Sequence, residues 1–147
     1  MKNHFPTFLF ACLFFLVANQ ISAQSAPSDS VYMMAQKMPE FPGGRAKVTE
    51  YLMKNVRMPQ QCRDEKVGGM AVVEFVVEKD GTPSSFRVAT SATEPFANNP
   101  EKLKLAKLLD EEALRLARNM PKWSPAEQDG QPVRARMRLP VKFTISF

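Results

Sequence analysis

The sequence is poor in the residues that most catalytic and metal sites use. It contains one histidine, His4, and two cysteines, Cys12 and Cys62, in 147 residues. His4 and Cys12 fall in an N-terminal segment that we expect to be removed, so the exported chain keeps one cysteine and no histidine. Histidine-dependent triads, histidine metal sites, an internal disulfide and a structural zinc site are then excluded. We expect no enzyme activity, no cofactor and no metal.

Paired carboxylates are the remaining candidates for acid and base chemistry. Glu74 and Glu78 are interpreted as the exposed face of a strand, because they are four residues apart in a valine-rich segment and residues at even spacing share one face of a strand. A second acidic group, Asp110-Glu111-Glu112, is interpreted as a helix N-terminus, where acids are favoured. Both structural interpretations are preferred over the acid and base of a glycosidase. Cys62, alone in a polar stretch, is expected to be a small buried side chain.

A long hydrophobic run is also missing. The apolar stretch from Phe8 to Ala18 is shorter than the roughly 20 residues that a membrane-spanning helix needs. It follows a short positive region at Lys2 and ends in small and polar residues, which is the pattern of a secretory signal peptide at residues 1–23. We expect cleavage before Gln24. The alternative is an uncleaved helix from Phe5 to Ala23 that anchors the chain in a membrane.

The chain is modestly basic, with a formal net charge of +5. Such a charge favours acidic protein segments or anionic membrane surfaces. Nucleic acid is not an expected partner for an exported protein.

Residues 24–37 are mostly small and polar and predict a short tether, and residues 38–147 predict one domain. A loop rich in proline and glycine opens this domain at 38–44. Asp80-Gly81 between two apolar runs predicts a hairpin. Apolar spacing predicts, in order, a helix at 44–55, a further helical turn at 60–66, strands at 70–78 and 84–91, one helix or two at 100–120, and a final strand at 132–147.

The final strand has the clearest pattern in the chain. Its odd positions are all apolar: Val133, Ala135, Met137, Leu139, Val141, Phe143, Ile145 and Phe147. Its even positions are proline, arginine, lysine, threonine or serine, so one face is predicted to be buried and the other to be basic. Pro140 has no N–H and cannot pair on both sides, which places the strand at a sheet edge. A long edge strand is a template for another extended chain, so peptide capture by strand addition is the first functional hypothesis.

Short motifs in a fixed order support this hypothesis. They are Phe41-Pro42-Gly43-Gly44, Met58-Pro59, Gly69 before 75–81, the acidic run with Ala113-Leu114, Met120-Pro121-Lys122-Trp123-Ser124-Pro125, and Gln131-Pro132-Val133 leading to 139–143. With these motifs, the chain from about Phe41 to Ile145 resembles the C-terminal domain of TonB, the energy transducer for outer-membrane receptors.

The resemblance implies an α+β fold with a three-stranded antiparallel sheet packed by two helices. It also implies that the C-terminal strand pairs with a short extended segment near the N-terminus of an outer-membrane receptor. The implied pairing residues are Val133, Arg134, Ala135, Arg136, Met137, Arg138, Leu139, Val141 and Lys142. The neighbouring contact region is the helical turn that holds Gln60, Gln61 and Arg63.

The resemblance further implies a periplasmic protein whose partner is a TonB-dependent receptor or another envelope protein. The expected cleavage of the hydrophobic segment and the short tether both differ from the anchor helix and long spacer of a TonB transducer. A protein that is not attached to the inner-membrane motor cannot pull, so energy transduction would require an associated motor complex. A second hypothesis is a structural module that forms a homodimer through its C-terminal edge strand.

Overall fold

The computed structural model describes residues 29–145, so the predicted signal peptide lies outside the described part of the chain. The helices are α1 (Arg45–Asn55), α2 (Gln60–Asp64) and α3 (Pro100–Arg118), with a 3-10 turn η1 at Glu94–Phe96. The strands are β1 (Val31–Tyr32), β2 (Gly69–Val77), β3 (Pro83–Thr90), β4 (Ala126–Gln128) and β5 (Gln131–Phe143). No helix within residues 29–145 combines the length and apolarity needed to cross a membrane.

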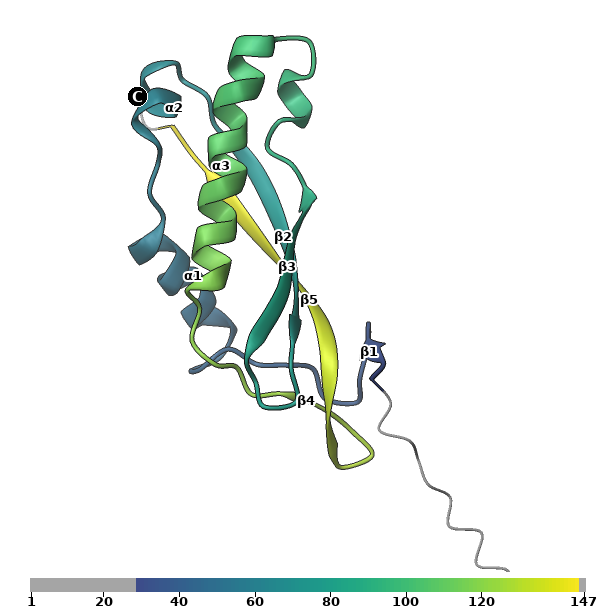
Figure 1. Cartoon of the computed structure of the whole chain (residues 1–147). Coiled ribbons are helices and arrows are strands. Elements are labelled where there is room, and N and C mark those ends of the chain that lie inside the picture. The colour runs from purple at the N-terminus through teal and green to yellow at the C-terminus, as the bar shows by residue number, and fades with distance from the viewer. Residues whose placement is uncertain (1–28, 146–147) are drawn as a thin grey trace, which may run out of the picture.

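Three long antiparallel strands form the body of the sheet, as predicted, in the order β5-β2-β3. Two short strands that the sequence did not predict are added to β5: β1 pairs with it in parallel and β4 in antiparallel orientation. Val31-Tyr32 therefore packs on the domain, although the sequence places it in the predicted tether. In Figure 1, α3 lies across one face of the sheet, and the opposite face carries no helix from residues 29–145.

The buried core lies between α3 and the sheet. Ala71, Val73, Phe75 and Val77 of β2 point to this side, as the alternation predicts, and pack against Leu109 and Leu116 of α3. Cys62 is fully buried in the same core and its pKa is raised by burial, as expected for a structural cysteine. Odd residues of β5, including Leu139 and Val141, complete the packed face.

The acidic run of 110–112 does not begin a helix. α3 is a single helix that starts at Pro100 after the Asn99 cap, whose side chain accepts from the Lys102 N–H at 3.0 Å. Asp110 instead accepts a hydrogen bond from the Ala92 N–H at 2.8 Å. Glu112 is buried and accepts from the Arg57 N–H at 2.8 Å. These acids are fixed by tertiary contacts, which helix-end statistics do not reveal.

Trp123 joins the loop after α3 to the core. Its side chain is 8% exposed and lies edge-on to Phe41 and Phe75, with both ring centroids at 5.4 Å. Its backbone N–H donates to Gly81 O at 2.9 Å, and Gly81 has a φ of +86° and no room for a Cβ. The indole Nε1 has no acceptor among residues 29–145, so ring packing holds the side chain.

Trp123→Ala should therefore lower the free energy of unfolding by about 3–5 kcal/mol, because it leaves a cavity where three rings meet. Trp123→Phe keeps a ring and loses no hydrogen bond, so it should lose much less. Urea unfolding followed by circular dichroism measures both. Equal stability of Trp123→Ala and the parent chain would contradict the packing role.

Candidate functional site

One edge of β5 is occupied and the other is largely open. β2 pairs with residues 135–143 from Val77↔Ala135 to Gly69↔Phe143. β4 pairs only with 131–133, and β1 only with Arg134 and Ala135. Since Ala135 pairs with both Tyr32 and Val77, β1 and β2 lie on opposite edges of β5. Within residues 29–145, no strand accompanies 136–143 on the edge opposite β2, and we call this segment the free edge.

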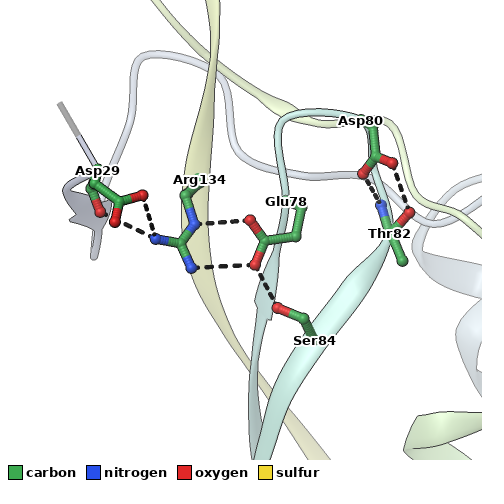
Figure 2. A network of polar contacts seen from close by, with 6 residues as sticks. All are labelled: Asp29, Glu78, Asp80, Thr82, Ser84 and Arg134. Atoms are coloured by element: carbon green, nitrogen blue, oxygen red, sulfur yellow. Dashed lines mark hydrogen bonds and ion pairs between the residues drawn. The ribbon is translucent and has the colours of Figure 1, made fainter. Parts of the chain in front are cut away.

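Three of the predicted partner-binding residues on β5 lie outside the free edge. Val133 and Ala135 are buried in a small cluster with Ala126. Arg134 is held within the chain: its Nε lies 2.7 Å from Glu78 Oε2, and its Nη1 lies 2.9 Å from Asp29 Oδ1 (Figure 2). The open part of the predicted site therefore begins at Arg136.

The contact between Arg134 and Glu78 ties the N-terminal segment to the sheet. The hydrogen bond from Arg134 lowers the pKa of Glu78, and the same bond raises that of Arg134. Figure 2 also shows Ser84 donating to Glu78 from the neighbouring strand. At the adjacent hairpin tip, the Thr82 N–H donates to Asp80 Oδ1 at 2.9 Å. Asp29 thereby fixes the chain just before β1.

Pro140 indicates which backbone groups face outward. Its register partner is Val72, within a ladder that runs without a shift along nine residues of β2. A proline fits such a ladder where its nitrogen faces away from the partner strand. Because backbone direction alternates along an antiparallel strand, the N–H groups of Arg136, Arg138 and Lys142 then also face the free edge.

A groove runs beside this edge on the helix side of the sheet. It has a volume of about 590 Å³, and its walls come from β5, α1 and the segment 38–41. The β5 wall is formed by four consecutive residues, 137–140. Since consecutive residues point to opposite faces, the groove must border the strand edge itself. Val48 and Leu52 form the apolar floor on α1, with exposed Thr49 beside them.

The helix-free face beside the same edge is basic. Glu74 lies at its centre with 3% exposure, so the prediction of an exposed strand face is wrong for this residue. Three guanidinium groups cover its carboxylate: Arg87 Nε at 2.9 Å, Arg136 Nη1 at 3.1 Å and Arg138 Nε at 3.2 Å. A register shift in the β2–β3 pairing between Glu74 and Val76 brings Arg87 opposite Glu74.

Burial raises the pKa of Glu74, but hydrogen bonds from Arg87 and Arg138, and then the charges of Arg87 and Arg136, outweigh it. The pKa therefore lies below its ordinary value of 4.5, and the carboxylate stays charged. One carboxylate thus organises three cations. Arg87 and Arg138 remain about 60% exposed, at 60% and 63%.

The predicted contacts on α2 lie near the C-terminal end of β5 (Figure 1). Gln60, Gln61 and Arg63 are all exposed, but Gln60 bonds to Asp64 and Arg63 bonds back to Met58 O. Gln61 lines a second groove, between α2 and the first half of α3, that shares no residue with the groove along β5. The structure therefore brings Arg136, Met137, Arg138, Leu139, Val141 and Lys142 together, and sets α2 apart from the groove.

Sequence reasoning missed the α1 wall and the arginine cluster. The apolar stripe through Val48 and Leu52 predicted a helix packed on the core, yet α1 has no fully buried residue. Its stripe is only half covered, and spacing alone does not show this. Alternation correctly placed Glu74 and Arg138 on the strand faces that point away from the core. It did not predict that the two residues lie opposite each other, because that depends on the register between strands.

Comparisons with known proteins give a match to one family model over part of the chain and two similar solved structures. Residues 104–145 match the sequence model described as "Gram-negative bacterial TonB protein C-terminal". Two solution structures of the Helicobacter pylori TonB C-terminal domain are also similar. The first, of residues 179–285, has 17% identity and a TM-score of 0.42, and covers 69% of this chain and 80% of that one. The second, of residues 194–285, has 16% identity and a TM-score of 0.40, and covers 69% and 94%. No curated protein sequence matches.

Glu74 generates a prediction about pH. A carboxyl group with a lowered folded-state pKa adds stability above its unfolded pKa, near 4.5, and loses it as the pH falls through the folded value. Glu74→Gln should cost about 1–3 kcal/mol at pH 7, since charged hydrogen bonds are lost. The gap between the two proteins should shrink as the pH falls from 5 to 3. Denaturant unfolding across this range measures the gap, and a gap that stays constant would contradict the assignment.

Proposed function

We propose that this member of the TonB C-terminal domain family captures an extended segment of a TonB-dependent outer-membrane receptor, or of another envelope protein, by strand addition at the free edge of β5. The family belongs to the cell envelope and is generally involved in energy transduction there. The chain itself acts as a binding module in this proposal. Energy would come from an associated inner-membrane motor complex.

The observation that carries the proposal is that residues 136–143 pair with β2 on one edge of β5, whereas no strand within residues 29–145 pairs with them on the other edge. Unpaired N–H and C=O groups along a straight edge are the template for an added strand. β1 supports this assignment, because Val31 and Tyr32 already pair in parallel with the same edge at Arg134 and Ala135. A partner segment would extend the row of hydrogen bonds beyond the point where β1 ends.

The charge pattern favours a different protein over a second copy of this chain. In an antiparallel homodimer built about a two-fold axis perpendicular to the sheet, Arg136, Arg138 and Lys142 of both copies would form one row on the same face. Like charges in cross-strand positions are destabilising. The homodimer that the sequence left open is therefore the weaker candidate.

Capture of a receptor segment supports a periplasmic location after removal of residues 1–23, since receptor N-terminal segments face that compartment in the family. Contacts of Gln60 and Arg63 with the receptor would lie at the C-terminal end of the free edge. The groove at Gln61 is separate and is not required for strand addition.

Backbone capture predicts that proline is worse than alanine at an outward N–H. Arg138→Ala and Arg138→Pro lose the same side chain, but only proline removes a donor from the free edge. Binding of a receptor N-terminal peptide to Arg138→Pro should be weaker than to Arg138→Ala by about 1 kcal/mol, roughly fivefold in Kd. Isothermal titration calorimetry on both variants, with circular dichroism to verify folding, makes the comparison.

If both folded variants bind the peptide equally, the backbone of 136–143 does not pair with it and strand addition is wrong. If Arg138→Ala alone abolishes binding, recognition depends on the guanidinium group.

A further inference from the structure

The free edge separates two surfaces of opposite character. On the helix side, the groove is lined by Met137 and Leu139 of β5 and by Val48 and Leu52 of α1. On the helix-free side, the cationic residues of the same strand are Arg136, Arg138 and Lys142. A strand added at this edge would place successive side chains alternately on these two surfaces.

The groove is large enough to hold side chains of a bound segment, beyond the backbone pairing at the edge. Its volume of about 590 Å³ falls within the range of roughly 300–1,000 Å³ typical of ligand pockets. The four β5 residues along it span about 13 Å, so alternate side chains of an added strand, spaced by about 7 Å, would enter it as a pair. Its lining is mostly apolar, with Glu40, Arg45, Thr49 and Arg138 also bordering it, and this favours aliphatic or aromatic side chains there.

The opposite face carries an excess of positive charge. Three arginines share the single carboxylate of Glu74, and each guanidinium has five N–H donors, so many donors remain after these bonds. Lys142 is exposed, and no acidic side chain within residues 29–145 pairs with it. Because Glu74 holds the arginines in place, part of the entropy cost of ordering them for an incoming anion has already been met.

We propose that the free edge selects an extended protein segment in which apolar and acidic residues alternate. The apolar side chains fill the groove against α1, and the acidic ones lie beside Arg136, Arg138 and Lys142. This inference rests on the proposed strand addition and names the class of segment that fits it. Alternation is the same in both chain directions, so the selection holds for parallel and antiparallel pairing alike.

The test uses the purified exported protein and three synthetic nine-residue peptides with blocked ends. One alternates valine and glutamate, one alternates valine and lysine, and one has the composition of the first with its valines and glutamates in separate blocks. The alternating valine–glutamate peptide should bind at least about tenfold more tightly than the valine–lysine peptide, since cross-strand charge pairs change sign. It should also bind more tightly than the block peptide, and its advantage over valine–lysine should fall with added salt.

Two variants separate the surfaces. Thr49→Trp fills the groove from an exposed position and should weaken binding of the valine–glutamate peptide, whereas Met53→Trp is a matched control. Met53 is 75% exposed on the same helix and does not line the groove. Lys142→Glu should narrow the preference for glutamate over lysine without changing the fold.

The inference is overturned if the glutamate and lysine peptides bind equally, if the block peptide binds as well as the alternating one, or if no synthetic peptide binds. It is also overturned if Thr49→Trp changes only the oligomeric state, which would place a second copy in the groove. Strand addition is judged separately, by the proline and alanine variants with a receptor peptide. That proposal survives when those variants differ and the synthetic peptides do not.

Discussion

The antiparallel pairing of β2 with β5 decides which side chains meet on each face of the sheet. Its register places Leu139 opposite Val73 on the helix side and Arg138 opposite Glu74 on the other. A slip of one residue would turn every side chain of β5 to the wrong face, so burial of the odd residues strongly fixes the register. The same pairing uses one edge of β5 and leaves 136–143 open on the other. The core, the arginine cluster and the free edge therefore depend on one ladder.

The pairing of β2 with β5 also positions the N-terminal segment and the groove. Arg134 binds Glu78 across the sheet and Asp29 before β1, so the segment reaches the edge just where the open part begins. The chain then passes through 38–41, which forms one wall of the groove and brings Phe41 against Trp123. Trp123 in turn packs on Phe75 of β2. A single aromatic cluster thus fixes both the loop before α1, through Phe41, and the loop between α3 and β4, through Trp123.

Local patterns in the sequence were sufficient to predict the hairpin, the helix at 44–55 and the two faces of β5, because these depend on alternation, helical spacing and turn residues. They left open whether residues 100–120 form one helix or two. The predicted edge was also correct for 136–143, since Pro140 limits pairing directly. The strand β1 was not predicted, because its two residues are too few to show a pattern. It occupies the edge of β5 at Arg134 and Ala135, so the edge is not open there. Glu74 was assigned to the right face but not recognised as buried, because the arginines that cover it come from β3 and β5. Such contacts are set by tertiary register, which local patterns do not contain.

Amide hydrogen exchange tests, residue by residue, whether the free edge binds a partner through its backbone. In the unbound protein, the amides of Arg136, Arg138 and Lys142 should exchange quickly, while those of Met137 and Leu139, paired with β2, are protected. Addition of a receptor N-terminal peptide should slow exchange at the three outward amides. Exchange that is unchanged there, but slowed in α2 and the first half of α3, would place the partner in the other groove and contradict binding at the free edge.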